Sequence, residues 1–143
     1  MNAPTSKQQG FTLIEIIVVV VIIGILATFV APKFLGRTDD ARITKAKSDI
    51  LALESALDVY KLDNYNYPTT DQGLEALIAP PTSDPIPNNW KKGGYIKKLQ
   101  KDPWQRDYLY LSPGEHAEVD IYSLGADGVE GGEGANADIG NWD

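Results

Sequence analysis

The stretch GFTLIEIIVVVVIIGILATFVAP, residues 10–32, decides the fold of this chain. From Ile16 to Ala31 only Gly24 and Thr28 interrupt a run of apolar side chains. Counted from Phe11, the run is long enough for a helix of about 31 Å at 1.5 Å per residue. That length matches a hydrocarbon core of about 30 Å. The sequence therefore predicts a membrane-spanning helix near the amino terminus.

A single acidic residue, Glu15, lies inside this run. A charged side chain costs about 2.5–3.5 kcal/mol at the centre of a span and usually has a partner. The run contains no Lys or Arg, but cleavage between Gly10 and Phe11 would create an amine one helical turn from Glu15. The amine could pair with Glu15 of its own helix or with Glu15 of a neighbouring copy. The second arrangement is heterologous and would build a filament.

Two simpler interpretations fit this segment less well. A secretory signal peptide has a basic start and a cleavage site after its apolar core. Here the upstream residues MNAPTSKQQG include one Lys, and the plausible cleavage point precedes the apolar run. A plain single-span anchor would not explain Glu15.

The chain after the apolar run favours a second helical segment with one buried face. Apolar residues recur at alternating steps of three and four, which is typical of an amphipathic helix: Ile43, Ala46, Ile50, Leu53, Leu57 and Tyr60. No proline interrupts residues 33–64. Joined to the span, this predicts one helix of about 50 residues.

Shorter elements are expected further on. Thr69 or Thr70 could cap a short helix that ends before Pro80, and the proline-rich residues 80–94 predict an irregular loop. Two alternating apolar runs on either side of residues 113–114, Pro-Gly, predict a β-hairpin. A third strand is expected near residues 95–96. These elements indicate an α+β fold with one long helix and a small antiparallel sheet.

Charge and composition exclude some functions. The net charge is −7 and there is no cysteine, so phosphate recognition and disulfide chemistry are not favoured. The only histidine, His116, falls in the predicted hairpin turn, and no catalytic constellation can be assembled around it. We therefore expect neither a nucleic-acid-binding protein nor an enzyme, although a membrane-anchored periplasmic enzyme is the alternative from another class.

The carboxyl-terminal tail is acidic and rich in glycine. After Arg106 there is no Lys or Arg but there are nine acids: Asp107, Glu115, Glu118, Asp120, Asp127, Glu130, Glu133, Asp138 and Asp143. Such a tail either stays solvated or binds a cation. Asp127, Asp138 and the amide oxygen of Asn136 are hard ligands, and the loop has no His or Cys, so calcium is favoured over zinc.

The amino-terminal stretch resembles the class III signal of type IV pilin-like proteins. That resemblance implies that a prepilin peptidase cuts after Gly10 and methylates the amine of Phe11. It also implies that Glu15 guides each subunit into a helical filament.

Nearly the whole chain resembles the major pseudopilins of type II secretion systems. The similar phrases are ALDVYKLDNYNYPTTDQGLEAL, GGYIKKL, KDPW, YLSPG, SLGADG and ADIGNW. The resemblance implies a type IV pilin-like fold with a calcium loop, whose ligands would include the carbonyls of Leu124 and Val129 and the side chains of Asp127 and Asp138. One departure is Gln105, where the family usually has glycine. Because Gln disfavours positive φ, a different turn is expected there.

The resemblance also implies an organisation and a function. Residues 1–10 would be a cleaved leader, residues 11–35 a transmembrane and filament-core helix, and residues 36–143 a periplasmic globular domain. The chain would be the major subunit of a periplasmic pseudopilus that drives folded proteins across the outer membrane.

Its implied partners are further copies of itself, minor pseudopilins, the inner-membrane assembly platform with its ATPase, the prepilin peptidase and the secretin channel. The flanking charges alone would instead leave the globular domain in the cytoplasm. A type IV pilin for adhesion or motility is the alternative within the family, and the absence of cysteine argues against it.

Overall fold

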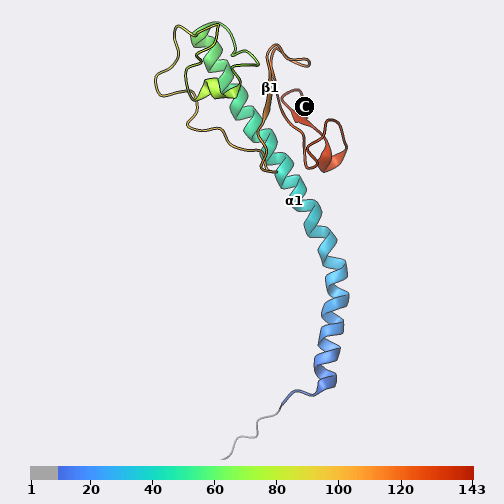
Figure 1. Ribbon diagram of the computed structural model, residues 1–143. Coiled ribbons are helices and arrows are strands. Elements are labelled where there is room, and N and C mark those ends of the chain that lie inside the picture. The colour runs from blue at the N-terminus through green and yellow to red at the C-terminus, as the bar shows by residue number, and fades with distance from the viewer. Residues whose placement is uncertain (1–9) are drawn as a thin grey trace, which may run out of the picture. The chain divides into compact units, whose positions relative to one another are not determined.

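The computed structural model describes residues 10–143, except that the side chains of residues 30–37 are not described (Figure 1). The chain forms two compact units that divide after Thr38. The predicted leader lies outside the described residues apart from Gly10. The boundary expected at residues 35–36 falls inside the undescribed side chains, close to the observed division.

One long helix, α1, spans Leu13–Asn64 and has 52 residues, as the sequence predicts. In its amino-terminal part the aliphatic side chains up to Phe29 are exposed. In its carboxyl-terminal part the predicted stripe is buried: Ala46, Ile50, Leu53, Leu57 and Tyr60 are core residues, and Ile43 is partly buried against them. The amino-terminal half of α1 is therefore exposed, whereas the carboxyl-terminal half buries one face in the core.

The sheet has three antiparallel strands in the order β1-β2-β3. Strand β1 spans Leu109–Leu111, β2 spans Asp120–Ser123 and β3 spans Ile139–Gly140. Leu111 is paired with Asp120, and Ser123 with Ile139. The hairpin prediction is confirmed.

The alternating apolar residues of the two predicted runs are all buried: Tyr108, Tyr110, Val119 and Ile121. In Figure 1, β1 and the carboxyl-terminal segment lie along the folded half of α1. Hydrogen bonds from Tyr108 to Asp49 (2.9 Å) and from Asn141 to Glu54 (3.1 Å) join them to the helix.

The third strand was expected in the wrong place. Residues 95–96 form no strand, because the N–H groups of Tyr95 and Ile96 both donate to one acceptor, the carbonyl of Leu77. A strand needs successive acceptors on a partner strand. The third strand is instead β3, at the end of the acidic tail. It has only two residues, which is too short for a recognisable alternating pattern in the sequence.

The short helix after α1 is also different from the expectation. A 3₁₀-helix, η1, spans Leu74–Leu77, and its N-cap is Gly73 with no side-chain cap. Thr69 does accept a hydrogen bond from the Gln72 N–H (3.2 Å), but Gly73 has φ 63° and ψ −172°, which ends any helix begun there. A second 3₁₀-helix, η2, spans Gly134–Asn136 in the tail. The predicted irregular loop at 80–94 is confirmed.

The turn at Gln105 corrects another expectation. Gln105 has φ 69°, so it adopts the left-handed conformation that suits glycine, and the turn is not of a different type. Asp102 stabilises this turn, because its Oδ1 accepts hydrogen bonds from the N–H groups of Trp104 (3.0 Å) and Arg106 (2.8 Å). The hydroxyl of Ser123 donates to the buried Oδ2 of Asp102 (2.7 Å), which ties the turn to β2.

Candidate functional site: the assembly segment and the acidic loop

The helix begins at Leu13 because Thr12 and Glu15 form a capping box. Oε2 of Glu15 accepts from the Thr12 N–H (2.7 Å) and from the Thr12 hydroxyl (2.8 Å). The Glu15 N–H in turn donates to the Thr12 hydroxyl oxygen (3.3 Å). Reciprocal bonds of this kind satisfy donors that a helix start leaves unpaired. In the uncleaved chain, Glu15 is thus already held by its own helix.

Around this cap the surface is apolar. Phe11 is 84% exposed, and the large aliphatic side chains that follow it are exposed as well. Phe11, Ile14, Val18 and Val19 line a shallow open groove next to Glu15. Contiguous apolar surface of this extent marks a contact with protein or membrane.

A membrane span is not recognised in the part of the chain that the structure describes: no helix there is both long and apolar enough to cross a bilayer. The side chains at 30–37, which complete the expected segment 11–35, lie outside that part. The transmembrane assignment therefore stays a prediction, as does the pairing of Glu15 with the Phe11 amine.

Sequence reasoning missed Thr12. Its signal was present, because Thr12 and Glu15 have the T-x-x-E spacing that precedes an apolar run at a helix start. In the sequence Glu15 is a lone charge in an apolar run, whereas in the structure Glu15 forms the helix cap together with Thr12.

The two predicted carboxylate ligands lie in the acidic loop and are hydrogen-bonded within it. Oδ1 of Asp127 accepts from the Val129 N–H (3.1 Å), and Oδ2 of Asp138 accepts from the Gly131 N–H (2.9 Å). The other oxygen of Asp138, Oδ1, is buried without a hydrogen-bond partner among the described residues. A buried acceptor left unpaired is costly, so this oxygen has capacity for a further ligand.

The remaining predicted ligands are close to the loop backbone. The carbonyl of Leu124 accepts from the Gly128 N–H (3.2 Å), the side chain of Val129 is exposed, and the side-chain amide of Asn136 makes no hydrogen bond within the described chain. Among the described residues, no group of three or more His, Cys, Asp or Glu side chains is placed to hold a metal ion. The expected ligand set has only two carboxylates and depends on carbonyl and amide oxygens for the rest.

A cation already contacts this loop, and the sequence did not reveal it. The guanidinium of Arg106 donates to the carbonyl of Gly125. Gly128 has φ 71°, and a Cβ there would lie 3.0 Å from the central carbon of that guanidinium, so a side chain at this position would be strained and would crowd Arg106. No Lys or Arg follows Arg106 in the chain, and this contact pins the start of the acidic tail to the turn after Asp102.

Asp120 organises the hairpin turn beside this loop. The buried carboxylate accepts from the N–H groups of Glu115 (2.7 Å) and Ala117 (2.9 Å) and contacts the His116 ring (3.0 Å). Burial alone would raise the pKa of Asp120, but these hydrogen bonds outweigh it and hold the pKa below its usual value. The ring of His116 stacks on Trp142 with centroids 4.0 Å apart. His116 is exposed in the hairpin turn, and its contact with Trp142 helps to hold the carboxyl-terminal tail.

Two family models match the chain. The model for type II secretion system protein G matches residues 33–142, and the model for the prokaryotic N-terminal methylation motif matches residues 5–31. The two matches meet within α1, between its exposed and its buried half.

Individual relatives agree with these models. The type II secretion system core protein G of Vibrio cholerae is 64% identical over 136 residues, which cover 95% of this chain and 92% of the relative. The corresponding protein of Pseudomonas aeruginosa is 61% identical, with 96% of each chain covered. A crystal structure of the major pseudopilin from the type 2 secretion system of enterohaemorrhagic Escherichia coli matches with a TM-score of 0.68 and 51% identity, over 76% of this chain and 92% of that one. The chain belongs to the type II secretion system protein G family, the major pseudopilins.

Proposed function

We propose that this chain is the major structural subunit of a type II secretion pseudopilus and performs no chemistry of its own. The observation that carries the proposal is the contrast within α1. One half is packed in a folded domain, and the other presents an exposed apolar surface that begins with a cap at Glu15. Named relatives along nearly the whole chain support the same function.

Assembly begins, on this proposal, with cleavage between Gly10 and Phe11 and methylation of the new amine. The match to the N-terminal methylation motif supports this step. The new amine would lie next to Thr12, whose N–H and hydroxyl both use Oε2 of Glu15. Oε1 of Glu15 is thus the oxygen left for the Phe11 amine of a neighbouring copy.

The cleavage step is tested by mass spectrometry of the protein purified from membranes. The expected chain begins at methylated Phe11. A chain that retains Met1 would contradict the leader assignment, and one that begins at unmodified Phe11 would contradict only the methylation.

The register step is tested with Glu15→Leu, and Val21→Leu is the control for a change within the same apolar surface. We expect both variants to enter the membrane fraction. Filament yield, measured by electron microscopy and cross-linking, should fall at least about 100-fold for Glu15→Leu, because the Phe11 amine of the neighbouring copy loses its carboxylate partner, and removal of one member of a buried ion pair costs about 3–5 kcal/mol at 1.4 kcal/mol per decade. Normal filaments from Glu15→Leu would show that Glu15 does not set the register.

A structural calcium ion in the acidic loop is the second part of the proposal. The unpartnered Oδ1 of Asp138 and the carboxylate of Asp127 suit a hard cation, as do the amide of Asn136 and the carbonyls of Leu124 and Val129. The bound cation would offset the repulsion among the tail carboxylates. The protein itself holds the loop in place through Arg106 and through the stacking of His116 on Trp142.

The calcium proposal is tested by thermal unfolding of the full-length protein in detergent with calcium or with a chelator. Ligand at 100 times its dissociation constant stabilises by about 2.7 kcal/mol, so the chelator should lower the Tm by several degrees. Asp138→Asn should abolish this response, whereas Glu133→Gln, which changes an exposed acid of the same loop, should retain it. An equal Tm with and without chelator would leave the loop as a solvated tail.

The place of the chain in the cell follows from the same proposal. The globular unit would lie in the periplasm, with residues 11–35 in the inner membrane before assembly. Minor pseudopilins, the assembly platform with its ATPase, the prepilin peptidase and the secretin would be its partners. Cysteine-scanning accessibility from the periplasmic side, with a cysteine at the exposed position of Glu133, tests the orientation: labelling is expected in intact spheroplasts, and its absence would place the domain in the cytoplasm.

A further inference from the structure

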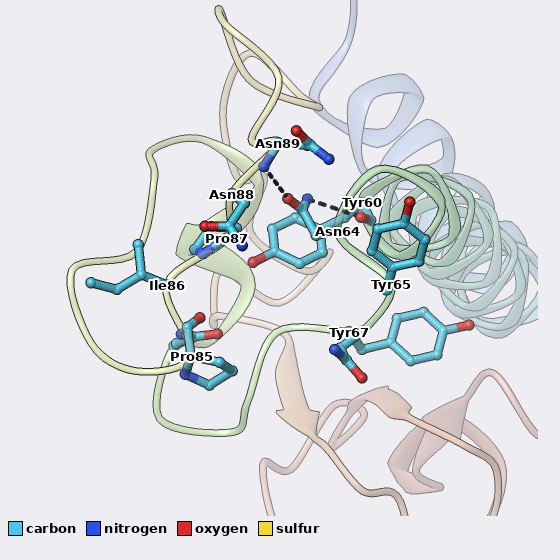
Figure 2. Close-up of a pocket in the computed structure, with 11 residues that line it drawn as sticks. Tyr60, Asn64, Tyr65, Tyr67, Pro85, Ile86, Pro87, Asn88 and Asn89 are labelled. Atoms are coloured by element: carbon cyan, nitrogen blue, oxygen red, sulfur yellow. Dashed lines mark hydrogen bonds between the residues drawn. The ribbon is translucent and has the colours of Figure 1, made fainter.

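A cavity of about 200 Å³ lies between the end of α1 and the proline-rich loop, in the globular unit and apart from the acidic loop. Figure 2 shows Asn64 and Tyr65 at the helix end on one side, and the segment from Pro85 to Asn88 on the other. This volume is below the roughly 300–1,000 Å³ of pockets for drug-sized ligands. It suits a single ring.

The chemistry of the lining is unusual for this chain. Almost a quarter of all residues are charged (23%), yet none of the eleven lining residues is charged. Five carry side-chain amides and three are tyrosines. Amides and aromatic rings without any formal charge fit a neutral ligand that has both hydroxyl groups and apolar C–H faces. A phosphorylated ligand would need Lys or Arg.

The walls of the cavity are held by hydrogen bonds that do not use the ligand-binding groups. The buried Gln72 donates to the carbonyls of Ser83 (2.8 Å) and Pro85 (3.1 Å). Asn64 accepts from the Asn89 N–H (3.2 Å) and donates to the Tyr95 hydroxyl (3.0 Å), as Figure 2 shows for the first of these. The loop is thus fixed at both ends, which lowers the entropic cost of binding.

Several side chains remain available at this cavity, and Asn66, Asn88 and Tyr65 are among them. The amides of Asn66 and Asn88 make no hydrogen bond within the described residues, although both line the cavity. Tyr65 is 80% exposed and has φ 68°. A bulky side chain in the left-handed region is strained, and strain of this kind is concentrated at functional sites. Folding alone would favour Gly or Asn at this position.

Other occupants fit the lining less well. An added peptide strand needs a row of free backbone donors and acceptors. Pro85 and Pro87 have no N–H, and the carbonyl of Pro85 is already used by Gln72. A lipid chain would leave the amides of Asn66 and Asn88 desolvated and unpaired.

We propose that this cavity binds one ring of an uncharged saccharide. Tyr65 stacks on the C–H face of the ring, and the amides of Asn66 and Asn88 bond its hydroxyl groups. The residues that line the cavity include none from the assembly segment 11–35 or from the acidic loop.

The test uses the ¹⁵N-labelled full-length protein in a detergent without a sugar headgroup, titrated with tri-N-acetylchitotriose and, separately, with maltotriose. We expect saturable NMR shifts at the side-chain amides of Asn66 and Asn88 and at the backbone of Tyr65. The side chain of Gln100, which is exposed and does not line this cavity, should not shift. The absence of saturable shifts with either sugar at millimolar concentration, or shifts confined to other regions, would overturn the proposal.

Variants separate binding from folding. Asn66→Ala and Asn88→Ala should each weaken binding by about 2- to 12-fold, as expected for one hydrogen bond, with an unchanged Tm. Gln100→Ala should leave binding unchanged. Tyr65→Gly should weaken binding about tenfold or more, from the loss of the apolar contact between the tyrosine ring and the C–H face of the sugar, without lowering the Tm, because glycine relieves the positive φ. Unchanged binding in Tyr65→Gly together with a lower Tm would show that Tyr65 only supports the fold and would overturn the proposal.

A neutral saccharide could come from a free oligosaccharide or from the glycan strands of the cell wall. Cosedimentation of the same detergent-solubilised protein with isolated sacculi distinguishes these sources. Sedimentation that is lost in Asn66→Ala/Asn88→Ala identifies the polymer, and binding of soluble sugars alone identifies a free oligosaccharide.

Discussion

The two halves of α1 are parts of one continuous helix, yet they are stabilised in opposite ways. Residues 13–29 expose aliphatic side chains on every face and contain a single charge, Glu15. Residues 46–64 bury one stripe against the sheet and η1 and expose charges on the other faces. A helix with one apolar face finds its partner within its own domain, whereas one that is apolar all round needs partners from outside. The difference teaches that the carboxyl-terminal half of α1 is stabilised within its own domain, whereas the amino-terminal half needs a partner from outside the subunit.

The largest effect should distinguish the halves with one matched substitution. Leu57 is 0% exposed and Leu26 is 57% exposed. Leu57→Ala should lower the free energy of unfolding by about 2–5 kcal/mol, because it opens a cavity in the core, while Leu26→Ala should leave it unchanged in the detergent-solubilised monomer. Chemical unfolding followed by tryptophan fluorescence measures this, since Trp90, Trp104 and Trp142 all lie in the globular unit. Equal losses from both variants would refute the contrast.

A second effect should confine acid sensitivity to the globular unit. Hydrogen bonds lower the pKa of Asp120 in the folded state. The contribution of Asp120 to the free energy of unfolding is therefore fully present above the unfolded pKa of about 4, and it is lost as the pH falls through the lower folded pKa. Asp120→Asn should cost about 1–3 kcal/mol at neutral pH, since the backbone N–H groups of the hairpin turn lose a buried charged acceptor. It should also flatten the decline in stability below about pH 4. An unchanged decline in Asp120→Asn would assign the acid response to other carboxylates.

A third effect should be restricted to the exposed half. Thr12→Ala removes the helix cap and should cost about 1 kcal/mol locally, which would appear as faster amide exchange at residues 13–16. Tryptophan-monitored unfolding of the globular unit should not change. Thr28→Ala is the matched control, because the Thr28 hydroxyl bonds only to the carbonyl of Gly24 within the helix (3.0 Å). Faster exchange in both variants would mean that Thr12 has no special role as a cap.

The smallest effect should be a gain. Gln105→Gly should raise the free energy of unfolding by about 0.5–1 kcal/mol, because glycine avoids the left-handed penalty but loses more chain entropy on folding. Gln100→Gly, at a position without positive φ, should instead be neutral or destabilising. Denaturant midpoints of the two variants and the parent chain provide the comparison. A loss of stability in Gln105→Gly would mean that the side chain makes contacts worth more than the strain.

Sequence reasoning was most successful where a pattern is local and periodic. The steps of three and four from Ile43 to Tyr60 predicted the buried face of α1, and the alternation around Tyr110 and Ile121 predicted the hairpin. It failed where a single backbone group decides the outcome. The carbonyl of Leu77 takes both N–H groups that a strand at 95–96 would need, and Gly73 breaks the helix that Thr69 would have capped.

The candidate sites divide along the same line. Gly10, Phe11 and Glu15 were predicted from their spacing and stay predictions, and Thr12 could have been found from the same pattern. The contact of Arg106 with the start of the acidic loop could not, because 19 residues separate Arg106 from Gly125. The cavity at the end of α1 likewise joins segments that have no common sequence pattern.

Two properties of this protein were determined by its sequence alone: the long helix and the change, along it, from an all-round apolar surface to a one-sided one. Both depend on side chains within a few turns of each other, for which the helical period is sufficient information. The tertiary structure alone decided where β3 pairs and that Arg106 donates to the carbonyl of Gly125. It also decided how Gln72 and Asn64 hold the proline-rich loop. These contacts join distant residues, and their free energy depends on geometry that exists only after the core around Leu57 has formed.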